Sequence, residues 1–159
     1  MDLNGNLRRI ALFAGHNSFE VRDSHAGYDL AGIDDTANDL QRDRISSRDG
    51  VVSVGTARRR RVPVVVEISA HAPADDLDGW DHVAETSVDV DSGRILVLGG
   101  SESQCGAARF DLPAGTYRVR VYSEGFAAFD EDAYRVVLWP GRARATTVLK
   151  RFTGEPAGG

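Results

Sequence analysis

The sequence predicts an all-β fold, specifically an antiparallel β-sandwich with a jelly-roll-like arrangement of about nine short strands. Two observations indicate this class. Short runs rich in β-branched and aromatic residues recur along the chain between turn-forming residues. No stretch shows a helical pattern of comparable strength. The length of 159 residues suits one domain, which we expect over residues 7–152, between disordered ends at 1–6 and 153–159.

The first part of the chain predicts two short strands and then a long irregular section. The strands are expected at 9–14 and 19–21, on either side of a Gly-His-Asn-Ser turn. Residues 23–49 are rich in Asp, Gly and Ser, and they contain one weakly helical stretch at 35–42. A loop of this length within a compact domain is usually either functional or disordered. The sequence leaves its role open.

The strand signal strengthens from residue 50 onward. In the run 62–70, Val64, Val66 and Ile68 share one face, which is the alternation of a half-buried strand. Residues 142–152 are expected to add one more strand or to form a basic arm. The other expected strands lie at 51–57, 83–90, 94–98, 109–112, 116–122 and 134–139.

The stretch 116–122 shows the same alternation with arginine on the second face. Tyr117, Val119 and Val121 point one way, and Arg118 and Arg120 point the other. The apolar face is therefore expected to pack on the core. The arginine face is expected to be in contact with solvent.

Composition and charge narrow the classes of function. The net charge of −5 argues against direct binding of nucleic acid. The longest apolar runs are too short to cross a bilayer, and the N-terminus lacks the pattern of a secretory signal, so a cytoplasmic location is expected. The single cysteine, Cys105, excludes an internal disulfide, and it is expected to be a loop thiol without a role. An ordinary apolar content of 42% means that folding requires no cofactor.

Acidic residues gather in loop stretches that lack basic residues. If these loops meet at one end of the sandwich, they form an electronegative rim that could steer the approach of a basic protein. The regular spacing of a calcium-binding loop is absent. The simpler interpretation is that the acidic loops only keep the domain soluble. The candidate partner-binding residues are Asp75, Asp76, Asp78, Asp81, Asp130, Glu131 and Asp132.

Other charged and aromatic residues suggest alternatives. The arginine run 58–61 could hold a phosphate, but it lies between two strands without interleaved aromatic residues, which favours a solvated connection. A second hypothesis is a small-ligand or carbohydrate-binding sandwich in which Trp80, Tyr122 or Trp139 provides a stacking surface.

The histidines carry the weakest hypothesis, a metal-dependent hydrolase that uses His16, His25 or His82. No pair of histidines has the spacing that places two metal ligands on one element. On a strand, His82 and Glu85 would point to opposite faces. No nucleophile, phosphate-loop or dinucleotide motif is present, so the protein is expected not to be an enzyme.

Several landmarks, read in order, resemble the bacterial competence protein J family. The most specific is Phe-Asp-Leu-Pro-x-Gly-x-Tyr, which begins at Phe110. The others are His-Asn-Ser-Phe-Glu-Val at 16–21, Gly-Val-Val-Ser-Val at 50–54, Gly-Arg-Ile-Leu-Val at 93–97 and Tyr-Arg-Val-Val-Leu-Trp at 134–139. The arginine run 58–61 and the extension from Pro140 depart from the family pattern, and both could change the partner.

The resemblance implies a small β-rich cytosolic protein that acts by binding another protein, without catalytic residues. The founding member of the family inhibits a DNA-entry nuclease. We therefore expect a non-enzymatic interaction module that inhibits a nuclease-like, basic partner through its acidic loops. The open edges of a sandwich also leave room for a homodimer.

Overall fold

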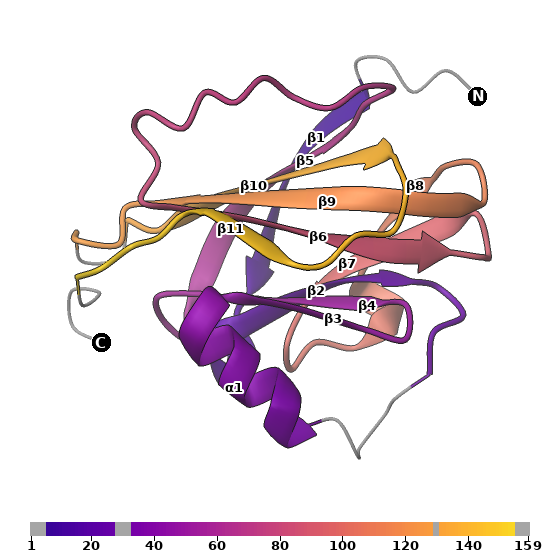
Figure 1. Cartoon of the computed structure of the whole chain (residues 1–159). Helices are drawn as coiled ribbons and strands as arrows, with labels where there is room; N and C mark the ends of the chain where they lie inside the picture. The colour runs from indigo at the N-terminus through magenta and orange to yellow at the C-terminus, as the bar shows by residue number, and fades with distance from the viewer. Residues whose placement is uncertain (1–5, 28–32, 129–130, 155–159) are drawn as a thin grey trace.

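The computed structural model describes residues 6–27, 33–128 and 131–154, and these residues form two β-sheets packed face to face (Figure 1). Sheet A contains, in spatial order, β1 (Asn6–Phe13), β5 (Arg61–Ile68), β10 (Ala133–Pro140), β9 (Gly115–Glu124), β6 (His82–Val90) and β11 (Thr147–Lys150). Sheet B contains β3 (Ile45–Arg48), β4 (Val51–Gly55), β2 (Ser18–Asp23), β7 (Arg94–Gly99) and β8 (Ala108–Asp111). The helix α1 (Ile33–Asp43) packs on β3 and β4, on the side of sheet B that faces away from sheet A (Figure 1).

The core lies between the sheets and follows the alternation seen in the sequence. Val64, Val66 and Ile68 of β5 are fully buried, as are Val119 of β9 and Val136 of β10. Phe19 from sheet B packs edge-on against Tyr134 from sheet A, with ring centroids 5.6 Å apart. The predicted β-sandwich is confirmed.

The strands outnumber the prediction because two short ones come from regions without a clear pattern. The described residues form eleven strands. β3 arises within the section 23–49, which was expected to be irregular, and it pairs with β4. β11 arises within 142–152 and pairs with β6, so one of the two alternatives for that section, an added strand, holds. The helix begins at Ile33 and ends at Asp43, close to the weakly helical stretch at 35–42.

Sheet A is not wholly antiparallel. β5 pairs with β10 in parallel, with Tyr134 opposite Val64 and Leu138 opposite Ile68. Its other neighbour, β1, is antiparallel. β1 and β11 are the edges of sheet A, and β3 and β8 are the edges of sheet B. Pairing of two copies through one of these edges remains a prediction.

The arginine face of sheet A is covered, which corrects the expectation that it meets solvent. Arg118 is 1% exposed and Arg120 is 5% exposed. Residues 69–81 run across the outer side of the sheet, and the chain from 141 to 150 borders it (Figure 1). The sandwich therefore has a second layer of buried side chains outside its main core.

The expected disordered ends fall largely outside the described residues. Residues 1–5 and 155–159 lie outside them, whereas Asn6 already begins β1. Phe152 packs edge-on against Phe126, with ring centroids 5.2 Å apart. Among the described residues, the packed structure thus includes Asn6 and the C-terminal segment that follows β11.

Candidate functional site

The covered face of sheet A is organised around Glu85. This carboxylate accepts hydrogen bonds from Nε and Nη2 of Arg118, at 3.0 and 2.8 Å, and from Nε of Arg120, at 2.8 Å. The strand register explains the arrangement, because Glu85 of β6 lies opposite Arg120 of β9, and Ser87 lies opposite Arg118. One carboxylate thus accepts hydrogen bonds from two guanidinium groups that are almost fully buried. Arg118 also donates through Nη1 to Ser87 and to the carbonyl of Arg144.

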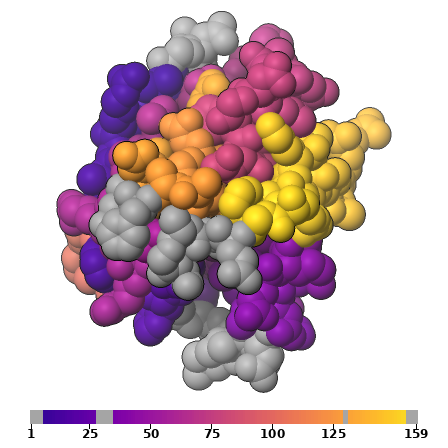
Figure 2. All heavy atoms as spheres, turned by 90° about the vertical axis from the view of Figure 1, so that its left-hand side faces the viewer, coloured from indigo at the N-terminus to yellow at the C-terminus, as the bar shows by residue number. Residues whose placement is uncertain are grey.

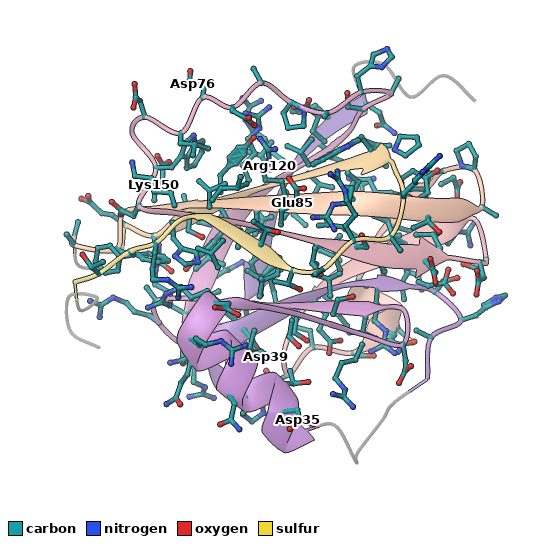
Figure 3. All side chains as sticks on the ribbon, in the orientation of Figure 1. Asp35, Asp39, Asp76, Glu85, Arg120 and Lys150 are labelled. Carbon is teal, nitrogen blue, oxygen red and sulfur yellow. The ribbon has the colours of Figure 1, made fainter. Side chains whose placement is uncertain are left out.

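The loop 69–81 lies over this cluster and contacts it through Asp75. Nη1 of Arg120 lies 3.1 Å from Oδ1 of Asp75 and donates to the carbonyl of Ala74 at 3.4 Å. The Asp75 side chain is 76% exposed, so Arg120 bonds a carboxylate that reaches in from the solvent side. Figure 3 shows Arg120 and Glu85 close together beneath the loop that carries Asp76.

The end of the loop is tied to the C-terminal segment. Lys150 donates through Nζ to the carbonyl of Leu77 at 3.2 Å. Figure 2 shows the C-terminal segment, in yellow, directly beside residues of the loop, in pink. The cover over sheet A is therefore built from two pieces that are distant in sequence and bonded to each other.

The three aromatic residues of the stacking hypothesis belong to this covered face. Tyr122 and Trp139 are buried, with exposures of 2% and 5%. The half-buried Trp80 packs edge-on against Tyr122, with ring centroids 5.1 Å apart. Arg120 lies over the ring of Trp139 at 5.5 Å. These rings hold the loop and the arginines in place; Tyr122 is enclosed, and Trp139 is buried except where it lines the hollow described next.

A hollow of about 520 Å³ remains between the loop, the C-terminal segment and the sheet. Its walls combine charged groups with apolar surface from the ring of Trp139 and the side chain of Leu149. The charged residues around it are Asp75, Glu85, Arg118, Arg120 and Arg144. This volume falls in the usual range of small-ligand sites.

The predicted acidic residues separate into exposed and internal groups. Asp75, Asp76 and Asp78 are exposed on the loop over sheet A, and Glu131 is exposed before β10. Asp81 is half-buried and accepts the backbone N–H of Phe126 at 2.9 Å.

Asp132 is the clearest internal member of the set, and Asp130 lies outside the described residues. Asp132 is 1% exposed. It accepts a bond from Nε of Arg60 at 2.8 Å and from the hydroxyl of Tyr134 at 2.6 Å. The hydroxyl of Tyr134 in turn accepts the N–H of Ala57 at 2.8 Å. Burial and the Asp132 carboxylate raise the pKa of Tyr134, so the phenol keeps its proton and the network stays complete.

The arginine run 58–61 contributes to structure. Arg60 pairs with Asp132, Arg59 lies over the ring of Phe13 at 5.4 Å, and Arg61 donates to the carbonyl of Ala11. The run therefore fastens the β4–β5 connection to its neighbours.

The histidines of the metal hypothesis belong to different elements, and His25 lies in the turn after β2. His16 lies in a short 3₁₀ turn (η1, Gly15–Asn17) beside α1, and His82 begins β6 with both ring nitrogens engaged by backbone groups. Across residues 6–27, 33–128 and 131–154, no group of three or more His, Cys, Asp or Glu side chains is placed to hold a metal ion. His82 and Glu85 point to opposite sides of sheet A, as predicted.

Sequence reasoning missed the Glu85–Arg118–Arg120 cluster as a unit. The signal was present as a lone glutamate and two arginines at alternate positions on predicted strands. What was lacking was the pairing of β6 with β9, which joins residues more than thirty positions apart. Cys105 is exposed in a second 3₁₀ turn (η3, Gln104–Gly106), consistent with a loop thiol.

The fold described above has known counterparts. The crystal structure of ComJ, inhibitor of the DNA degrading activity of NucA, from Bacillus subtilis, superposes with a TM-score of 0.67 over 84% of this chain and 96% of ComJ, at 14% sequence identity. The chain has a ComJ-like fold. The product of crocagin biosynthetic gene J is similar too, with a TM-score of 0.64 over 86% of this chain and 97% of that one, at 16% identity. This sequence matches no protein-family model and no curated protein.

The ComJ-like fold agrees with the resemblance read from the Phe110 motif, which forms the end of β8, the turn after it and the start of β9. The arginine run 58–61 and the segment after Pro140, which were expected to depart from the family pattern, here fasten and cover sheet A. Among the described residues, no helix is long and apolar enough to span a membrane.

Proposed function

We propose that this protein is not an enzyme and acts by binding another protein in the cytoplasm, and that its partner is a nuclease whose DNA cleavage it inhibits. The observation that carries the proposal is the likeness to ComJ, an inhibitor of the DNA degrading activity of NucA, over 96% of the ComJ chain. At 14% identity the likeness concerns the fold, and a shared fold does not fix the target. The choice of partner must therefore come from the surface.

The loop 69–81 is the surface that we propose for the partner. It holds three exposed carboxylates, Asp75, Asp76 and Asp78, without a basic residue between them. Lys150 and Arg120 anchor the loop at two points, so these groups are held on an ordered segment. Nucleases that grip DNA present basic surface to it, and an exposed acidic loop complements such a surface. Glu131 would extend the acidic surface next to the β9–β10 turn.

The test is capture of the partner followed by an inhibition assay. The tagged protein is incubated with an extract of its source organism at 25 and 300 mM NaCl, and proteins retained only at low salt are identified. The captured nuclease is then purified and its cleavage of a DNA substrate is followed as this protein is added. We expect cleavage to fall to zero near a one-to-one ratio. Retention of no nuclease at low salt, or a captured nuclease that cleaves DNA at an unchanged rate, would contradict the proposal.

A further inference from the structure

The hollow on the outer face of sheet A has an excess of positive charge. Arg118, Arg120 and Arg144 border it, against the two carboxylates of Glu85 and Asp75. Glu85 already accepts hydrogen bonds of 2.8 to 3.0 Å from Arg118 and Arg120. Asp75 is the second carboxylate, and it belongs to the covering loop.

Arg120 is the group through which the hollow can bind an anion. Its side chain is 6% exposed. Nε donates to Glu85, and Nη1 contacts Asp75 and makes two long hydrogen bonds, each of 3.4 Å, to the carbonyl of Ala74 and the hydroxyl of Tyr122. The hydrogen bonds of Arg120 to the described residues all come from Nε and Nη1, so Nη2 is unused there. The edge formed by Nη2, which is unused, and Nη1, whose contact with Asp75 can be exchanged, suits a planar, two-oxygen anion in a confined site.

Asp75 shows what chemistry this edge accepts. Its carboxylate lies 3.1 Å from Nη1 of Arg120, and the Asp75 side chain as a whole is 76% exposed. An ion pair with so exposed a partner is weak, because solvent screens the attraction. A carboxylate from elsewhere can therefore exchange with Asp75 at small cost, whereas the buried Glu85 cannot be displaced.

We propose that the hollow is a binding site for a small carboxylate compound with an apolar body. Its carboxylate takes the place of Asp75 at Arg120, and its apolar part lies against Trp139 and Leu149. The volume of about 520 Å³ suits a compound of this size. Asp75 acts as a built-in competitor that occupies Arg120 when the compound is absent. This inference concerns a small ligand and stands apart from the proposed protein partner.

The test uses phenylacetate, with phenylacetamide as an uncharged probe of nearly the same shape. The ¹⁵N-labelled protein is titrated with each probe, and the Nε–H signals of Arg120 and Trp139 are followed by NMR. We expect saturable shifts of both signals with phenylacetate and no saturable shift with phenylacetamide. Inorganic phosphate is titrated as a third probe and is expected to bind at least tenfold more weakly than phenylacetate.

Two variants separate exchange with Asp75 from a general charge effect. Asp75→Asn removes the competitor, whereas Asp76→Asn removes the same charge one residue along the same loop. We expect the affinity for phenylacetate to rise at least threefold in Asp75→Asn and to change less than twofold in Asp76→Asn. Equal affinities of the two variants, equal binding of the amide, tighter binding of phosphate, or shifts confined to residues away from Arg120 and Trp139 would each overturn the assignment. None of these measurements requires the partner protein, so their outcome is independent of the inhibition assay.

Discussion

Nδ1 of His82 accepts the backbone N–H of Phe152 at 3.2 Å, so the imidazole at the start of β6 fastens the chain that follows β11. Because Nδ1 accepts, the ring proton sits on Nε2, which donates to the carbonyl of Asp43 at 2.8 Å. The imidazole is therefore neutral. Burial lowers the pKa of His82, the hydrogen bond to Asp43 opposes this effect, and the nearby charges of Arg44 and Arg151 lower the pKa further.

Acidification is expected to destabilise the fold through His82. In the unfolded chain this histidine takes up a proton near its ordinary pKa of 6.5, and in the folded protein it does so only at lower pH. Between these pH values the unfolded chain binds more protons, so the free energy of unfolding falls as the pH drops below about 6.5. Urea unfolding at several pH values between 7.5 and 5 measures how steeply the free energy of unfolding changes with pH. His82→Gln should flatten this dependence, while Gln in place of the exposed His71 should leave it unchanged; equal slopes in all three proteins would rule out His82 as the source.

Loss of the Glu85 charge is expected to be costly because two buried guanidinium groups depend on it. Glu85→Gln leaves Arg118 and Arg120 without their shared anion, and removal of one partner from a buried ion pair costs about 3–5 kcal/mol. The control is Glu67→Gln. Glu67 pairs with Arg135 on the same sheet, but these side chains are 23% and 35% exposed, so its loss should cost about 1 kcal/mol or less. Unfolding in guanidinium chloride gives the free energy of unfolding of each variant. Similar values for Glu85→Gln and Glu67→Gln would contradict the prediction.

The Tyr134 hydroxyl is expected to stabilise the β4–β5 connection. Tyr134→Phe removes the group that bridges Asp132 and the N–H of Ala57, which leaves two buried polar groups without this partner. The expected cost is about 1–3 kcal/mol, with faster hydrogen exchange at the Ala57 amide. The control is Tyr122→Phe, because the hydroxyl of Tyr122 accepts only a 3.4 Å contact from Arg120. Unchanged exchange at Ala57 in the Tyr134 variant would count against the bridge.

Neutralising the acidic loop is expected to slow association with the partner. In the triple variant with Asn at Asp75, Asp76 and Asp78, the association rate at low salt should fall about tenfold, with a smaller change in the dissociation rate, because charge outside the buried contact mainly steers encounter. The matched control carries Asn at three other exposed aspartates, Asp35, Asp91 and Asp111. Surface plasmon resonance at 25 and 300 mM NaCl measures the association rate of each triple variant with the partner. Equal slowing in both triple variants would indicate an effect of net charge alone and would remove the loop from the interface.

The sandwich could be predicted from the sequence because its long strands carry their own pattern. Val64, Val66 and Ile68 alternate with more exposed neighbours, and burial follows that alternation. β3 could not be predicted this way. Its residues, Ile-Ser-Ser-Arg, show no apolar alternation, and the strand exists because it pairs with β4.

The same limit applies to the covered face. Arg118 and Arg120 have the sequence pattern of a solvent-facing strand face, and the alternation in β9 is as predicted. Their burial depends on residues 69–81 and 141–150, which pass beside them only in the folded chain. A local pattern identifies the two faces of a strand but does not show what lies against each face.

The parallel pairing of β5 with β10 ties folding to synthesis of the chain. β5 takes one neighbour from residues 6–13 and the other from residues 133–140. As the polypeptide leaves the ribosome, the β1–β5 pair must therefore wait, with the second hydrogen-bonding edge of β5 unpaired, until most of the protein has emerged. Unpaired strand edges of this kind invite association with other chains. Nascent chains stalled before residue 133 should for this reason be the form of this protein that most needs protection by chaperones.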